Sequence, residues 1–149
     1  MSEHRATIEW RSSGGFRDNR YSRAHSLSFD GGAEVRGSSS PSVVPEPLSD
    51  PAGVDPEELL VASAASCHML WFLDLARQAE LDVAAYRDEA TGVLGRLDGR
   101  IAVTRITLRP RVEFAGEAPG AERLARLHHD AHERCFIANS LKTEIVVEG

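Results

Sequence analysis

Apolar and polar residues alternate with a period of two in six segments of the chain, a pattern typical of half-buried β-strands. The turn sequence Asp30-Gly31-Gly32 and the hairpin sequence Leu97-Asp98-Gly99-Arg100 separate neighbouring segments and predict antiparallel pairing. In residues 101–114 the alternation slips in phase once, between Val103 and Ile106, as a β-bulge would give. The predicted strands are residues 6–10, 25–30, 33–36, 83–97, 100–114 and 141–147.

Two segments have a helical pattern instead. The first begins at Asp55 as N-cap, with Pro56 at the first helical position and Glu58 completing a capping box. Its apolar residues between positions 59 and 75 cover nearly the whole circumference of the helix, which predicts a helix packed on several sides. Because a chain this short has little material to surround one helix, we expect a second copy to pack against it. The second helix is predicted over residues 121–134, with one apolar stripe formed by Leu124, Leu127, Ala131 and Cys135.

Length and composition predict a single domain over residues 1–149. The chain has 149 residues, is 42% hydrophobic and carries a formal net charge of -6, which argues against a nucleic-acid partner. The apolar run before Asp74 holds about fifteen residues, fewer than the ~20 of a membrane span, so we expect no membrane partner. The polar N-terminus lacks an apolar signal core, which favours a cytoplasmic location. Residues 37–53 contain four prolines and are expected to form a loop.

The candidate chemistry is that of Cys67 and Cys135, the two cysteines of the chain. Two cysteines are too few for a disulfide scaffold, and each could simply fill a small gap in the core. If the fold brings them together, they form a redox-active dithiol, in which a thiolate attacks a peroxide and the second thiol condenses with the sulfenic acid. Such a thiolate needs a nearby cation, for which an arginine held by Glu57 or Glu58 is suited.

Two stretches resemble the OsmC/Ohr family of thiol peroxidases. Residues 55–67, Asp-Pro-Glu-Glu-Leu-Leu-Val-Ala-Ser-Ala-Ala-Ser-Cys, are similar to the family's helix signature, in which a Pro-Glu pair precedes a cysteine. Residues 135–145, beginning Cys-Phe-Ile-Ala-Asn-Ser-Leu, are similar to its second-cysteine segment. The resemblance implies an α+β protein of the OsmC-like fold, with two antiparallel sheets wrapped around long central helices in an intertwined homodimer. It also implies reduction of organic hydroperoxides without a bound cofactor, using an external thiol or dithiol such as a lipoylated protein.

The resemblance further implies a role for each site residue. Cys67 is the peroxidatic nucleophile, Cys135 the resolving thiol and Glu57 the carboxylate that orients an arginine. Arg23 is the favoured arginine, with Arg17 and Arg20 as alternatives. On a straight helix Glu57 and Cys67 lie ~15 Å apart along the axis, so either the helix breaks near residues 62–65 or Glu57 acts from the other subunit. An apolar mouth formed by Leu70, Trp71 or Phe136 would favour organic peroxides over hydrogen peroxide.

Two rival functions remain open on the sequence. His128, His132 and Cys135 share a helical face and could bind zinc. Alternatively the chain is a non-catalytic scaffold that binds a small hydrophobic ligand and does not use its thiols. His68, adjacent to Cys67, points away from it by about 100° on a helix, which favours a core histidine with a hydrogen-bond partner over a catalytic base.

Overall fold

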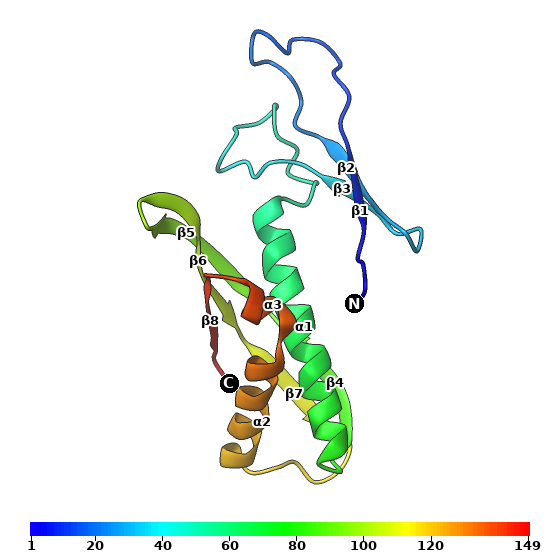
Figure 1. Cartoon of the computed structure of the whole chain (residues 1–149), viewed down its shortest axis with the longest axis vertical. Coiled ribbons are helices and arrows are strands. Elements are labelled where there is room, and N and C mark those ends of the chain that lie inside the picture. The colour runs from blue at the N-terminus through cyan, green and yellow to red at the C-terminus, as the bar shows by residue number, and fades with distance from the viewer. The chain divides into compact units, whose positions relative to one another are not determined.

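A computed structural model describes all 149 residues, which form two compact units, Met1–Leu59 and Leu60–Gly149. Figure 1 labels their helices and strands. That the two units act as one domain stays a prediction.

The first unit contains the predicted N-terminal meander. Its strands β1 (Ala6–Glu9), β2 (His25–Phe29) and β3 (Glu34–Gly37) pair antiparallel in the order β1-β2-β3. Gly32 has a φ of 94°, a left-handed conformation that favours glycine in the turn between β2 and β3. The expected loop over residues 37–53 is confirmed from residue 38 onward, since residues 38–53 contain no helix or strand, while Gly37 is the last residue of β3. A single bridge from Gly37 to Val54 closes it.

Helix α1 (Pro56–Gln78) begins with the predicted capping box. The Asp55 N–H donates to Glu58 Oε1 at 3.0 Å, and the Glu58 N–H donates to Asp55 Oδ1 at 2.7 Å. These two bonds satisfy backbone groups that lack a partner at a helix start. The helix is unbroken over its 23 residues. Its buried side chains follow one stripe: Ala64, His68, Phe72, Leu75 and Ala76. The rest of its apolar surface is only partly covered by this chain.

The two long strands predicted over residues 83–97 and 100–114 are each divided in two, so that part of the prediction is wrong. The structure has four strands in two separate sheets, with β5 pairing β6 and β4 pairing β7. Pro110 has no N–H to continue the ladder, and β6 ends just before Arg109. The bounds are β4 (Val83–Asp88), β5 (Thr91–Leu97), β6 (Arg100–Leu108) and β7 (Pro110–Phe114).

The phase slip after Val103 is the predicted bulge. Val93 pairs with Arg105 and Leu94 pairs with Val103, which leaves Thr104 as the extra residue of β6. On β5, Gly92 approaches α1 so closely that an added Cβ would lie 2.6 Å from a Val61 methyl group.

The rest of the second unit comprises α2 (Ala121–Arg134), α3 (Phe136–Ser140) and β8 (Glu144–Val147). The predicted second helix is confirmed at both ends, whereas the short helix α3 was not predicted. Strand β8 runs parallel to β6, so this sheet is not wholly antiparallel. Helix α2 lies alongside the C-terminal part of α1 (Figure 1), and their contact forms a core of Phe72, Leu75, Ala76, Leu127 and Ala131.

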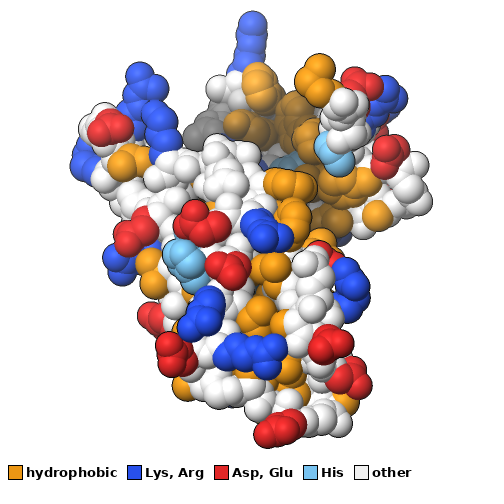
Figure 2. Space-filling view, turned by 60° about the horizontal axis from the view of Figure 1, so that its bottom comes forward, with side chains coloured by type: hydrophobic (Ala, Val, Ile, Leu, Met, Phe, Trp, Pro, Cys, Tyr) orange, Lys and Arg blue, Asp and Glu red, His pale blue; other side chains and the backbone are white.

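Several large apolar side chains remain at the surface, and Figure 2 shows hydrophobic side chains exposed among charged ones. Among them, Leu70 is 61% exposed, Phe136 68% and Ile101 64%. By length and hydropathy alone α1 could also cross a membrane, a test that the core helix of a globular protein passes as well.

Candidate functional site

Cys67 and Cys135 occupy different local structures. Cys67 lies in the middle of α1 and is half-buried. Cys135 connects α2 to α3 with an extended backbone, φ -66° and ψ 113°, and is 2% exposed. Its sulfur accepts a hydrogen bond of 3.4 Å from the Ala138 N–H, so Cys135 is the N-cap of α3. The break between the two helices therefore fixes the position of this thiol.

The second unit brings the two thiols together. Burial raises the pKa of the Cys135 thiol, and the adjacent Cys67 thiol raises it further, while the Ala138 and Ile137 N–H groups oppose the shift. Cys135 is therefore held as a neutral thiol. No disulfide joins the two residues, which are both free cysteines. The structure thus places the two sequence-predicted cysteines beside one another across the contact of α1 with the α2–α3 junction.

An open apolar pocket of about 320 Å³ lies at Cys67. Leu70, Trp71 and Phe136, the residues named from the sequence as its possible mouth, all line it together with Asp74. The Trp71 and Phe136 rings meet edge to face with centroids 5.5 Å apart. Phe72, in contrast, is fully buried in the core. An apolar molecule can therefore reach the half-buried Cys67 through this pocket.

Asp74 is a pocket residue whose position the sequence analysis missed. It lies seven residues after Cys67, which places both on one helical face. Arg77 donates to its carboxylate at 2.9 Å and Gln78 at 2.7 Å. The hydrogen bond from Arg77, followed by that from Gln78, lowers the pKa of this carboxyl below its ordinary value. The pocket beside Cys67 therefore has an ionised carboxylate at its rim.

Arg23 lies in the first unit, within an aromatic cluster. Its guanidinium stands 3.6 Å from the centroid of the Tyr21 ring and donates to the Tyr21 carbonyl at 2.6 Å and to Asn19 Oδ1 at 2.8 Å. The Trp10 and Phe16 rings pack on the same tyrosine, with centroids 5.6 and 5.0 Å away. Arg23 makes no ion pair with a carboxylate. Its positive charge is held by an aromatic face and by neutral oxygens.

The other two candidate arginines differ from Arg23. Arg17 and Arg20 are exposed, whereas Arg23 is half-buried and lines a cavity of about 470 Å³ with Trp10, Phe16 and Tyr21. Neither exposed arginine forms an ion pair. Arg23 is thus the arginine whose guanidinium has a fixed position.

Glu57 lies in the first turn of α1, half-buried and without an ion-pair partner in this chain. Glu58, the other acid considered, is occupied by the capping box. The predicted alternative of a helix break near residues 62–65 is wrong, because α1 is continuous. Ten residues of regular helix separate Glu57 from Cys67, a rise of ~15 Å. The two side chains of one helix therefore do not share a site.

His68 is a core histidine with a hydrogen-bond partner, as the sequence favoured. It is 1% exposed, and its Nε2 lies 3.0 Å from His128 Nδ1. The two rings stack at 5.3 Å, and His128 stacks on Phe72 at 4.3 Å. Burial, and then the neighbouring His128 and His132, lowers the pKa of His68 to about 4; burial lowers the pKa of His128 to about 4. Both rings are neutral at physiological pH.

The predicted zinc cluster has no counterpart in the arrangement of side chains. Three or more His, Cys, Asp or Glu side chains are nowhere grouped to hold a metal ion. Cys135 faces Cys67, while His128 is bonded to His68. Two of the three zinc candidates thus have separate partners on α1.

Comparison with known proteins assigns the family. The model of the OsmC-like protein family matches residues 49–148. The chain belongs to the OsmC-like family. A solved structure of an OsmC-like protein of unknown function from Vibrio cholerae is 51% identical, with a TM-score of 0.96 and coverage of 99% of each chain. The resemblance stated from residues 55–67 and 135–145 is confirmed, as is the α+β fold of the OsmC-like type.

More distant relatives share the fold of this OsmC-like protein. An organic hydroperoxide resistance protein from Elizabethkingia anophelis is 17% identical, with a TM-score of 0.70 and coverage of 99% of this chain and 93% of that one. One from Bacillus subtilis is 18% identical, with a TM-score of 0.69 and coverage of 99% and 97%. No curated protein matches the sequence.

Proposed function

We propose that this OsmC-like protein reduces organic hydroperoxides to alcohols, with Cys67 as the reacting thiol and Cys135 as the resolving thiol. The observation that carries the proposal is the pairing of Cys135 with Cys67, the thiol that lines an open apolar pocket. The organic hydroperoxide resistance proteins among the structural neighbours are consistent with this activity at the level of the family.

The order of the two thiols follows from their surroundings. The Cys67 thiolate attacks the terminal oxygen of the peroxide, the O–O bond breaks, and the alkoxide takes a proton to leave as the alcohol. Cys67 becomes a sulfenic acid. Cys135 then condenses with it, forming a disulfide and releasing water. Cys135 is suited to this second step because burial raises the pKa of its thiol and keeps it from competing for the peroxide. An external thiol or dithiol, such as a lipoylated protein, reduces the disulfide.

The cation that activates Cys67 is assigned to Arg23, and the carboxylate that orients it to Glu57, both supplied by the second copy of a homodimer. Three features support this assignment. The α1 helix is continuous, so Glu57 cannot reach Cys67 of the same helix. Arg23 has no carboxylate partner within the chain. The face of α1 that carries Leu70 is uncovered and apolar, as an interface of a homodimer requires.

Oxidant titration tests the proposal. We expect reduced protein to lose both free thiols per equivalent of cumene hydroperoxide and to lose two mass units as an intrachain disulfide forms between Cys67 and Cys135. The apolar pocket predicts faster oxidation by cumene hydroperoxide than by hydrogen peroxide. The matched Cys135→Ser variant should stop at a sulfenic acid on Cys67. Oxidation of Cys135 before Cys67 would contradict the proposed mechanism. Equal oxidation rates with cumene hydroperoxide and hydrogen peroxide would contradict the proposed preference for organic peroxides.

A further inference from the structure

A second pocket lies away from the thiols, between α2 and the strands β7 and β8. It has a volume of about 440 Å³, within the range of small-molecule sites. Its walls are mostly apolar and include Leu124 on α2, Val112 on β7, and Ile145 and Val147 on β8. No Lys, Arg, Asp or Glu side chain lines it. The polar side chains that line it are histidines.

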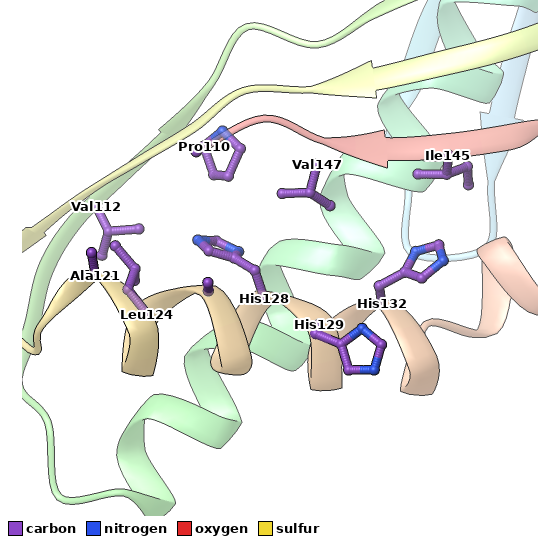
Figure 3. Close-up of a pocket in the computed structure, with 11 residues that line it drawn as sticks. Pro110, Val112, Ala121, Leu124, His128, His129, His132, Ile145 and Val147 are labelled. Atoms are coloured by element: carbon purple, nitrogen blue, oxygen red, sulfur yellow. The ribbon is translucent and has the colours of Figure 1, made fainter.

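Two of these histidines direct their rings into the space between helix and strands. His128 and His132 are four residues apart and share one face of α2, and Figure 3 shows both rings pointing toward β7 and β8. His129 projects away from the strands in the same view and is exposed. The chemistry of the pocket therefore depends on which ring nitrogens of His128 and His132 carry protons.

The hydrogen bond between His68 and His128 indicates which ring nitrogen of His128 carries the proton. His68 Nδ1 is buried without a partner, while His68 Nε2 lies 3.0 Å from His128 Nδ1. Buried N–H groups without an acceptor are rarer in proteins than unpaired acceptors, so the bare nitrogen of His68 is Nδ1. Its Nε2–H then donates to His128 Nδ1. A neutral His128 must carry its own proton on Nε2, the nitrogen left for the pocket.

The same reasoning applies to His132. Its Nδ1 is also buried without a partner, which again favours the bare form at this nitrogen. Its proton is then on Nε2. Both rings thus present an N–H donor on the pocket side of α2, and no lining side chain carries a charge that would hold an ion. An unpaired ionic group would be poorly accommodated in such an apolar space.

We propose that this pocket binds a small uncharged molecule, a single-ring ketone or a compound of similar chemistry, whose carbonyl oxygen accepts hydrogen bonds from Nε2–H of His128 and His132. The site is separate from the thiol pocket, and the proposal does not depend on peroxidase activity. The apolar part of the ligand lies against the valines and isoleucine of β7 and β8. The carbonyl supplies the acceptor that these two donors lack.

Ligand titration of the full-length protein at pH 8 tests the proposal, with acetophenone as the probe. We expect saturable binding at one site, with shifts confined to the His128 and His132 ring resonances and neighbouring methyl groups in NMR spectra. Ethylbenzene, which lacks the oxygen, and benzoate, which is charged, should each bind at least about threefold more weakly. Equal binding of ethylbenzene, tighter binding of benzoate, or no saturable binding of acetophenone would each overturn the proposal.

A matched pair of variants locates the contact. His132→Phe should weaken acetophenone binding about 3- to 10-fold, the effect of one hydrogen bond, while Glu133→Gln, at an exposed position of α2 outside the pocket, should leave it unchanged. If His132→Phe fails to fold, the ¹⁵N chemical shifts of the wild-type imidazole rings still decide the question, because they distinguish protonated from bare nitrogens. Protons on Nε2 of both residues are expected. A proton on Nδ1 of either residue would overturn the assignment of donors.

Discussion

Cys67 and His68 are neighbours in α1, yet they belong to two different kinds of site. Cys67 is half-buried at an open pocket that contains a carboxylate, and its partner Cys135 is a thiol. His68 is 1% exposed, and its partner His128 leads to a pocket without charged side chains. Successive residues of a helix differ by 100° in direction, so one helix serves both sites. Exposure to solvent distinguishes the proposed reactive site from the proposed binding site.

The largest effect is expected for removal of the proposed nucleophile. Cys67→Ser should reduce turnover of cumene hydroperoxide by about a thousandfold or more, because a serine hydroxyl at this position has no activating base. Turnover is measured with a dithiol reductant in excess. The exposed neighbour Ser66 provides the matched control, and Ser66→Ala should stay within about twofold of the wild type.

The Cys67→Ser variant also tests whether the thiol pocket and the histidine pocket are independent sites. Acetophenone binding should be unaffected in Cys67→Ser, since the histidine pocket does not include the thiol. A wild-type protein without measurable turnover, whose acetophenone binding is unchanged in Cys67→Ser, would support the non-catalytic scaffold instead. If acetophenone binding fell together with turnover, the two pockets would be one coupled site.

Local signals predicted the parts of the fold that depend on neighbours in sequence. The capping box at Asp55 and the hairpin at residues 97–100 are examples, because their partners lie within three residues. The split of residues 100–114 into two strands had a local signal in Pro110, which the alternating pattern obscured. That β4 pairs with β7 in another sheet depends on distant packing and has no such signal.

The site residues divide in the same way. The family motifs identified Cys67 and Cys135, and the structure brings the two thiols together. The His68–His128 bond joins residues 60 positions apart, so no spacing rule could indicate it, and His128 was taken as a zinc candidate instead. Asp74 had a signal that was not used, namely its position two helical turns after Cys67.

A smaller effect is expected on stability at acid pH. His68 and His128 stay neutral in the folded protein down to about pH 4, whereas in the unfolded chain each takes up a proton near pH 6.5. Their contribution is therefore complete above pH 6.5 and is lost as the pH falls toward 4. The free energy of unfolding should drop by about 1.4 kcal/mol per pH unit for each histidine, or about 2 to 4 kcal/mol between pH 6.5 and 5.

Urea unfolding at several pH values measures this dependence. The variant His68→Leu/His128→Leu replaces both rings by apolar side chains of similar size, so the slope between pH 6.5 and 5 should become shallower whatever its absolute stability. Carboxylates and His132 are present in both the wild type and the variant, so their contributions to the pH dependence cancel when the two slopes are compared. An unchanged slope would show that the two rings are not held neutral in the fold.

The smallest effect concerns the charge at the thiol pocket. Asp74 is ionised at its rim, so it should disfavour hydroperoxides that carry a carboxylate relative to neutral ones such as cumene hydroperoxide. Asp74→Asn should raise kcat/KM for a fatty-acid hydroperoxide about two- to fivefold relative to cumene hydroperoxide, since exposed charges interact weakly. Glu122→Gln is the matched control, because this exposed acid is likewise paired with an arginine, Arg126 at 3.3 Å, but lies outside the pocket. The gain should shrink in high salt, which screens the repulsion. If kcat/KM rose equally for both substrates, or equally in both variants, the rise would not come from the carboxylate beside Cys67.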